Sequence, residues 1–308
     1  MTDFDLVTVG HFSIDFIKTK EEPCPKPTLG GPPTYVSLAA RKMDVRVSVI
    51  SKVGGDFPDE YRAWLINEGI DLSMLRMVRD ASTTSYLLEY SVKDERQLIL
   101  KSKAPPIESE EIPESLSSDV IHVSPIAGEV SYQVMKKLQQ HSDLLSLDPQ
   151  GFLRRFDENG VVHLGMLDDP KILSEVDVFK ASDREIKAAT GESTLLRAIR
   201  LVHAWGVDVV IVTRGGRSTI LSLSGKLYEV PPAKSRVVAD TTGAGDVFIG
   251  AFLAEYIKGE DPIWCSCVGS ASASYVIEEV GPKGFGSQSE VYERASQIHE
   301  NVSSVISI

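Results

Sequence analysis

The sequence has few cysteines, a deficit of basic residues and no long apolar run. Its 308 residues include three cysteines, Cys24, Cys265 and Cys267, whose number and spacing do not suit a disulfide framework. Cys265 and Cys267 are separated by one residue and have no second pair, so they do not match the ligand spacing of a zinc site. We interpret all three as free thiols in a reducing compartment.

Charge and hydropathy exclude further classes of protein. The chain carries 32 Lys and Arg against 44 Asp and Glu, a formal net charge of −12, which argues against a general nucleic-acid-binding surface. No apolar run is long enough to cross a bilayer, and the first residues lack the basic segment of a secretion signal. We therefore expect a cytoplasmic protein with no nucleic-acid partner and no membrane association.

Short β-rich runs alternate with helical patterns along most of the chain. We expect strands near 6–9, 46–50, 119–123, 144–148, 176–180 and 209–213, and helices near 34–43 and 58–68, from 184, and after 243 and 261. This alternation predicts an α/β fold, a doubly wound and mainly parallel sheet with helices on both faces, in one domain that spans 1–308. In such folds ligands bind at the carboxyl ends of the strands.

Two stretches depart from the alternation. Residues 16–29 leave the first strand and become rich in proline, and 85–101 reads as two strands joined by a charged turn at 93–96. Together, at about 16–30 and 85–102, they predict a small β-sheet lid. An exposed hairpin or an edge that forms a homodimer is compatible with the same pattern.

The most informative segment is Asp-Thr-Thr-Gly-Ala-Gly-Asp at 240–246, which runs directly into an apolar helical pattern. The first turn of a helix has backbone N–H groups without intrahelical partners, and these groups favour an anion. The residues Gly243, Ala244 and Gly245 are therefore expected to form an anion hole, with Asp246 as a general base beside a phosphoryl group in transfer. The alternative is a capped helix, in which Asp240 or Thr242 is the N-cap and Asp246 is an ordinary first-turn acid.

Five segments in the same order resemble the signatures of the ribokinase family, the PfkB-type carbohydrate kinases. Segment 240–246 matches the D-T-x-G-A-G-D core without a gap. The other four are the strand and aspartate at 7–15, Gly30-Gly31 followed by 51–56, the segment 180–185 where the family has an N-x-x-E box, and the strand end at 212–216. The resemblance covers nearly the whole chain and implies the ribokinase-like fold, in which the lid closes over the acceptor.

The resemblance also implies an activity, the ATP-dependent transfer of the γ-phosphoryl group to a hydroxyl of a small polyol or sugar. It places the acceptor at Asp15, Gly30, Gly31 and Tyr35, to which we add Asp148 because it falls at a strand end. It places the nucleotide at Ser182, Glu185, Thr213, Gly215, Gly216 and Ser272. Because no cluster of Lys or Arg accompanies the substrate loops, a neutral polyol or nucleoside is favoured over a sugar phosphate.

Two acidic residues are candidates for metal binding. Glu185 is expected to hold Mg²⁺ through water molecules, and Ser182, which replaces the asparagine of the family's box, can also form a capping box with it. Asp240 either ligates a monovalent cation such as K⁺ or caps the following turn. The small-residue helix at 269–274, which contains Ser272, either packs against adenine or is only a close-packed helix.

The acceptor loop departs from the family pattern. The family commonly has G-G-x-x-x-N, whereas this chain reads Gly-Gly-Pro-Pro-Thr-Tyr at 30–35, which argues against a standard ribokinase and allows Tyr35 to pack flat against a ring. The variant resembles archaeal and plant inositol kinases, so myo-inositol is the leading expectation for the acceptor. The alternatives are a nucleoside kinase of the same family and a non-catalytic nucleotide-binding regulator. Only the replacement at Ser182 favours the regulator.

Overall fold

The computed structural model of the chain describes residues 3–18, 25–90 and 96–307, so Cys24 and the expected turn residues 93–95 lie outside the described residues. The helices include those expected near 34–43 and 58–68, from 184, and after 243 and 261, together with others that the sequence did not indicate. They are α1 (Pro32–Lys42), α2 (Asp59–Asn67), α3 (Tyr132–Gln139), α4 (Gln150–Leu153), α5 (Asp183–Thr190), α6 (Leu195–Ala204), α7 (Ala244–Ile257), α8 (Pro262–Val276) and α9 (Gln288–His299), with 3₁₀ turns η1 (Ser109–Glu111) and η2 (Pro170–Glu175). Cys265 and Cys267 are buried free thiols.

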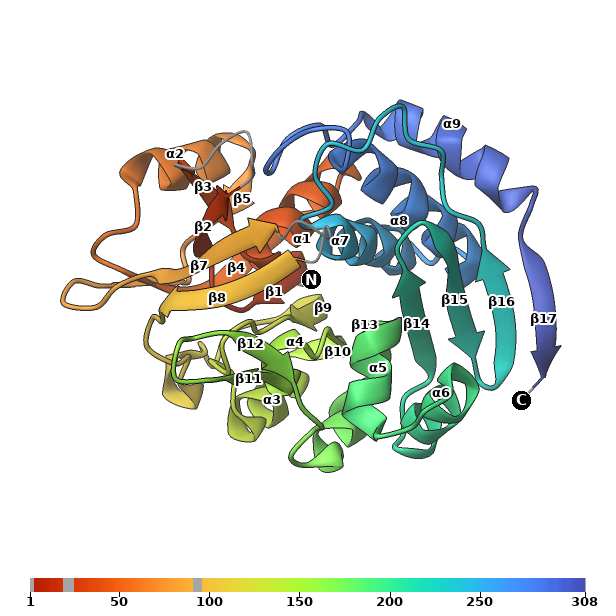
Figure 1. Ribbon diagram of the computed structural model, residues 1–308, viewed down its shortest axis with the longest axis horizontal. Coiled ribbons are helices and arrows are strands. Elements are labelled where there is room, and N and C mark those ends of the chain that lie inside the picture. The colour runs from red at the N-terminus through yellow and green to blue at the C-terminus, as the bar shows by residue number, and fades with distance from the viewer. Residues whose placement is uncertain (1–2, 19–24, 91–95, 308) are drawn as a thin grey trace.

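Among the described residues, eleven strands form one large sheet in the order β17-β16-β15-β14-β13-β10-β9-β1-β4-β5, with β6 also paired to β4 (Figure 1). Its strands are β1 (Phe4–Val9), β4 (Val47–Gly54), β5 (Ile70–Asp71), β6 (Leu75–Val78), β9 (Ser118–Val123), β10 (Ser142–Leu147), β13 (Val178–Ser182), β14 (Val209–Arg214), β15 (Arg217–Leu223), β16 (Lys226–Val230) and β17 (Ser303–Ser307). Neighbouring strands pair in parallel across the part of the sheet made of β14, β13, β10, β9, β1, β4 and β5. Strands β15, β16 and β17 extend the sheet as an antiparallel edge.

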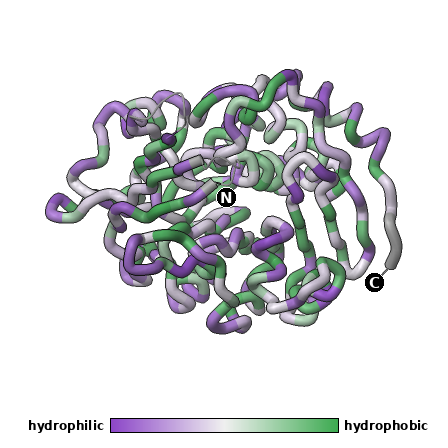
Figure 2. Tube along the Cα trace, viewed as in Figure 1, coloured by the Kyte–Doolittle hydropathy of each residue, from purple (hydrophilic) through white to green (hydrophobic). Residues whose placement is uncertain are grey.

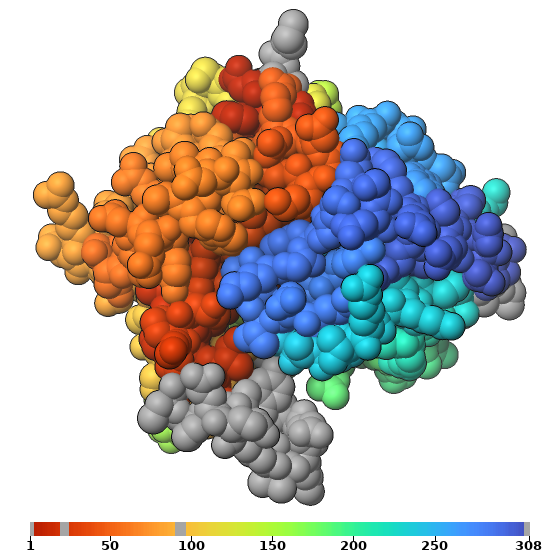
Figure 3. All heavy atoms as spheres, turned by 90° about the horizontal axis from the view of Figure 1, so that it is seen from above, coloured from red at the N-terminus to blue at the C-terminus, as the bar shows by residue number. Residues whose placement is uncertain are grey.

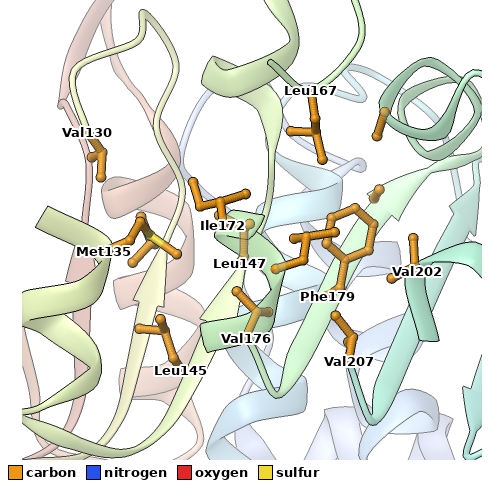
Figure 4. Packing of buried hydrophobic residues seen from close by; sticks show 14 of the residues in the cluster. Val130, Met135, Leu145, Leu147, Leu167, Ile172, Val176, Phe179, Val202 and Val207 are labelled. Atoms are coloured by element: carbon orange, nitrogen blue, oxygen red, sulfur yellow. The ribbon is translucent and has the colours of Figure 1, made fainter. Parts of the chain in front are cut away.

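Helices cover both faces of the large sheet. In Figure 1, α1, α7, α8 and α9 lie on one side of it, and α3, α5 and α6 lie on the other. Successive side chains of β14 show why two cores form: Val209 and Ile211 belong to the cluster with α7 and α8, whereas Val210 and Val212 belong to the opposite cluster. Figure 4 shows the second cluster at close range, and the strands of the sheet are largely hydrophobic in Figure 2.

A second, smaller sheet stands apart from the large one. Its strands are β2 (Ser13–Lys18), β3 (Pro27–Gly30), β7 (Thr84–Tyr90) and β8 (Arg96–Ser102), in the order β3-β2-β7-β8. The pairs β2–β3 and β7–β8 are antiparallel, and β2 and β7 pair in parallel. Its buried Tyr86 and Leu88 pack with Ile126 and with the hairpin β11 (Arg154–Phe156) and β12 (Val162–Leu164). The sheet forms from the two stretches expected to make a lid; the homodimer expected through it stays a prediction.

The helices α7 and α8 are apolar on most sides because protein surrounds them. Nine successive residues of α7, 247–255, are buried. Within the described ranges, no helix combines the length and the apolarity that a membrane crossing requires. Figure 3 shows a part of the N-terminal half of the chain, in orange, lying against C-terminal segments in blue. Leu38 of α1 and Phe285 belong to one hydrophobic cluster.

The crossing of α1 and α7 is close enough to require a glycine. A Cβ on Gly250 would lie 2.5 Å from the carbonyl oxygen of Val36 and 3.1 Å from the Cβ of Ala39. This contact fixes the distance between α1, which follows Gly31, and α7, which begins after Gly243. The crossing therefore holds the first turn of α1 and the first turn of α7 in a fixed relation.

We predict that Gly250→Ala lowers the free energy of unfolding by about 1–3 kcal/mol, because the added methyl group overpacks the crossing. Helix propensity alone predicts the opposite sign, since alanine is the better helix former. Gly216→Ala is the control: a Cβ there meets no atom within 4 Å, so we expect a change within about 0.5 kcal/mol. Urea unfolding measures both, and a Gly250→Ala protein as stable as the wild type would contradict the close crossing.

Candidate active site

A cavity of about 1100 Å³ opens at the carboxyl ends of the parallel strands, beneath the small sheet. One end is lined by residues of the small sheet and of α1, and the other by the strand ends of β13 and β14 and by α8. The first turn of α7, from Gly243 to Asp246, lies on the cavity wall between them. The lining includes the predicted residues Asp15, Gly31, Tyr35, Ser182, Glu185, Thr213, Gly215, Gly216, Gly243, Ala244, Gly245 and Asp246.

The turn before α7 differs in detail from both expected forms. Gly243 itself is the N-cap, with φ 77°, so neither Asp240 nor Thr242 caps the helix. The N–H of Ala244 donates to the carbonyl oxygen of Thr241 at 3.3 Å, which engages one of the three expected anion donors. The N–H groups of Gly243 and Gly245 make no hydrogen bond to another described residue. These two amides are the better candidates for an anion hole.

Both glycines of this turn are required by their neighbours. A Cβ on Gly243 would overlap the ring of Tyr35, and the positive φ there disfavours any side chain. A Cβ on Gly245 would lie 2.6 Å from Nζ of Lys180. The aromatic ring and the ammonium group can therefore reach the backbone of the turn only because these positions lack side chains.

The register of the sheet brings a buried ion pair to this turn. Leu147 of β10 pairs with Phe179 of β13, so the next residues, Asp148 and Lys180, lie side by side. Nζ of Lys180 donates to Oδ2 of Asp148 at 2.6 Å, and both residues are buried. Asp148 was expected to contact the acceptor; it is instead fully buried, does not line the cavity, and holds Lys180 in place.

Asp246 is half-buried and lines the cavity. Burial raises the pKa of Asp246 to about 7, against the lowering effect of Lys180 and Arg154. Asp148 and Glu185 add negative charge that raises it further. Burial lowers the pKa of Lys180, but Asp148 and Asp246 more than compensate and raise it, so Lys180 stays charged. A carboxylate with a pKa near neutrality is suited to accept and release a proton.

Among the cavity residues that the sequence did not indicate, three surround Asp246: Lys180, Gln150 and Arg154. Nε2 of Gln150 donates to Oδ1 of Asp246 at 3.2 Å, and Nη2 of Arg154 donates to Oε1 of Gln150 at 2.7 Å. No cluster of Lys or Arg accompanies the substrate loops in the sequence, but Arg154 and Lys180 reach the cavity from other segments. The sequence offered a signal of position for two of them: Lys180 ends a predicted strand, and Gln150 comes soon after another.

At the acceptor end, Asp15 lines the cavity from the middle of β2. Its Oδ1 accepts a hydrogen bond from Oγ of Ser13 at 2.7 Å. A Cβ on Gly30 would overlap the Asp15 carboxylate, so this glycine makes room for Asp15 and does not itself line the cavity. Tyr35 is 2% exposed and supports Gly243, so its ring does not serve the acceptor alone.

Apolar side chains complete the acceptor end. Tyr86 and Leu98 of the small sheet and Ile126 line the cavity. The hydroxyl of Tyr86 donates to the carbonyl oxygen of Ile126 at 2.6 Å, and burial raises the pKa of this tyrosine to about 12. The group is therefore neutral at physiological pH, and its ring is held in place.

The nucleotide end combines both interpretations of the 182–185 box. Oγ of Ser182 accepts from the N–H of Glu185, and Oε2 of Glu185 accepts from the N–H of Ser182 at 2.8 Å, which completes a capping box on α5. Both residues also line the cavity. The expectation for Ser272 is wrong: it is buried inside α8, and its neighbours Ser270 and Ala273 face the cavity instead.

The residues at 240–242 suit a monovalent cation better than a divalent one. Oδ1 of Asp240 accepts from the N–H of Thr242 at 2.9 Å, which leaves Asp240 Oδ2 and Thr242 Oγ1 buried without a hydrogen-bond partner in the described structure. Two buried oxygens on one short turn that lack a hydrogen-bond partner suit a cation. In the described ranges, no group of three or more His, Cys, Asp or Glu residues is placed to hold a metal.

The chain is similar to known kinases over most of its length. The chain is 28% identical over 285 residues to the cytidine kinase of Thermococcus kodakarensis, covering 90% of this chain and 97% of the relative. It is 26% identical over 288 residues to the nucleoside kinase of Methanocaldococcus jannaschii, covering 90% and 91%. A pyrophosphate-dependent kinase in the ribokinase family, solved with a pyrophosphate analog and myo-inositol, superposes with a TM-score of 0.78 at 22% identity, over 90% of this chain and 96% of that one.

The superposition confirms the expected ribokinase-like α/β fold. The family model of the pfkB family carbohydrate kinases matches residues 3–287, nearly the whole chain. The expected enzyme class, an ATP-dependent phosphotransferase with an alcohol group as acceptor, is that of this family. The chain belongs to the pfkB family of carbohydrate kinases.

Proposed function

We propose that this kinase transfers the γ-phosphoryl group of ATP to a hydroxyl of a nucleoside, with Asp246 as the general base. The observation that carries the proposal is the position of Asp246: its carboxylate opens onto the cavity beside the unpartnered amides of the α7 turn. The acceptor oxygen bonds to the γ-phosphorus while the bond from that phosphorus to the β–γ bridging oxygen breaks. The hydroxyl proton passes to Asp246, and ADP leaves.

The groups around Asp246 divide the remaining work. The N–H groups of Gly243 and Gly245 stabilise charge on the transferred group, and the Lys180 ammonium adds a fixed positive charge beneath the turn. Water is kept out by the small sheet, which acts as a lid over the acceptor end. A non-catalytic regulator would not need a base placed in this arrangement.

The cations follow from the same residues. Mg²⁺, when bound, neutralises charge on the β- and γ-phosphates. Glu185 would hold it through water by Oε1, because the capping box occupies Oε2. Asp240 Oδ2 and Thr242 Oγ1 would hold a monovalent cation such as K⁺ close to the α7 turn, where it offsets the charge of Asp240.

Two observations favour a nucleoside over myo-inositol as the acceptor. The acceptor end carries the apolar surfaces of Tyr86, Leu98 and Ile126, which suit the faces of a nucleobase, whereas every ring carbon of a cyclitol bears a hydroxyl. The two curated relatives compared above are named as cytidine and nucleoside kinases. Myo-inositol, the leading expectation from the sequence, is the second candidate, supported by the superposed structure that contains it and by the hydroxyl-binding Asp15.

Asp246→Asn should lower kcat by about 10²–10⁴-fold, because the amide cannot accept the hydroxyl proton. It should leave the affinity for ATP within a few-fold, because the amides of the turn remain. The matched control is Asp261→Asn at the N-cap of α8, outside the cavity, which should keep full activity. An Asp246→Asn enzyme with more than about a tenth of the wild-type kcat would remove Asp246 from the chemistry.

A screen of acceptors tests the substrate. With ATP as donor, we expect at least one of cytidine, uridine or adenosine to show a kcat/KM about tenfold or more above myo-inositol, fructose and ribose. Ribose is the internal control, since it offers the same sugar without the base. Leu98→Ala should reduce the preference for the nucleoside over ribose with little change for ribose itself. Faster turnover of myo-inositol than of any nucleoside would discard the nucleoside in favour of the second candidate.

A further inference from the structure

One short segment carries a side chain that contacts the base, Gln150, and a second that contacts Gln150, namely Arg154. Gln150 is the first residue of α4, and Arg154 is the first residue of β11, four positions later. The segment is fastened to the neighbouring loop, because the N–H of Gly151 donates to the carbonyl oxygen of Pro125 at 2.6 Å and a Cβ on Gly151 would collide with Pro125. Both side chains line the cavity.

The contacts of Arg154 determine which way the Gln150 amide faces. A guanidinium group only donates hydrogen bonds, so its 2.7 Å contact must be made to the amide oxygen, Oε1. The NH₂ group of Gln150 is then left facing Oδ1 of Asp246 at 3.2 Å. Arg154 is itself held by the carbonyl oxygen of Ile126 at 3.1 Å and lies 5.5 Å from the ring centroid of Tyr86.

We propose that Gln150 and Arg154 are positioning residues for the catalytic base: Arg154 fixes the Gln150 amide, which donates to Asp246 Oδ1 and leaves Oδ2 to take the proton of the acceptor hydroxyl. The inference rests on the proposed role of Asp246. It assigns the segment 150–154 a part in the reaction that no sequence motif indicated.

The charges around Asp246 come from several elements. Lys180 in the middle of β13 and Arg154 on β11 favour its ionised form, whereas Asp148 after β10 and Glu185 on α5 oppose it. A hydrogen bond donated by a neutral amide also favours the ionised form without adding charge. The Gln150 amide therefore holds the base unprotonated at a lower pH than burial would otherwise allow.

The pH profile of kcat separates this role from simple packing. The base must be ionised, so activity falls as the pH drops through its pKa, and loss of the amide donor should raise that pKa. Gln150→Leu should move the acid limb about one pH unit higher, since a hydrogen bond to a charged group is lost. Gln150→Glu, which keeps the shape of the side chain but adds a negative charge, should move it further in the same direction.

Arg154→Lys tests the fixing of the amide. Lysine keeps the positive charge but has no planar fork to hold both Ile126 and Gln150, so we expect kcat to fall about tenfold or more while the KM for ATP stays within about threefold. Arg155→Lys is the matched control, because Arg155 pairs with the exposed Asp168 and does not line the cavity. It should leave kcat unchanged.

Unfolding midpoints of all variants establish that the protein compared is folded, and the nearly isosteric Gln150→Glu covers the case in which Gln150→Leu does not fold. An acid limb of Gln150→Glu that superposes on the wild type, at full kcat, would overturn the inference. Full kcat in Arg154→Lys would overturn the part of Arg154. If either result occurs while Asp246→Asn is inactive, the positioning inference fails and the proposed function stands. If Asp246→Asn is active, the proposed function itself fails.

Discussion

The site depends on one buried ion pair, between Lys180 and Asp148, beside the first turn of α7. Taking two charges out of water is costly, and a pair joined at 2.6 Å recovers that cost only when its geometry is fixed. The register of β10 against β13 supplies this geometry, since it sets Asp148 next to Lys180. The pair leaves a positive charge under Gly245, where it lowers the pKa of Asp246 against the effect of burial.

Much of the rest of the fold serves to bring α7 to this pair. The α7 turn lies almost a hundred residues after β10 in the sequence, and the tight crossing at Gly250 holds α7 against α1. In the first turn of α1, the ring of Tyr35 packs against Gly243, so the acceptor loop and the anion-binding turn form one unit. Substitutions at Tyr35 therefore act on both substrates, which makes this residue a poor probe of acceptor choice.

The sequence predicted the features that a local pattern contains. The alternation of strands and helices predicted the parallel sheet, the 240–246 motif predicted the turn before α7, and the Ser182–Glu185 spacing predicted a capping box that the structure contains. These predictions succeed because each depends on residues a few positions apart.

The missed features depend on the order of strands in the sheet. The pairing of Lys180 with Asp148 and the contact of Gln150 with Asp246 join segments 32 and 96 residues apart, so no local pattern contains them. For the same reason the sequence showed no cluster of Lys or Arg near the substrate loops, although Arg154 reaches the cavity. Ser272 was misplaced because a helix of small residues does not reveal which of its faces is turned to the cavity.

The central claim is that Asp246 is a carboxylate whose pKa lies near neutrality because burial opposes the charge of Lys180. Carbon-13 NMR of the aspartate carboxyl carbons, with the Asp246 resonance assigned by its loss in Asp246→Asn, measures this directly. The account predicts a titration midpoint near 7 for this carbon in the ligand-free enzyme. A midpoint near the ordinary value of 3.8 would contradict it, because Asp246 would then be a solvated first-turn acid.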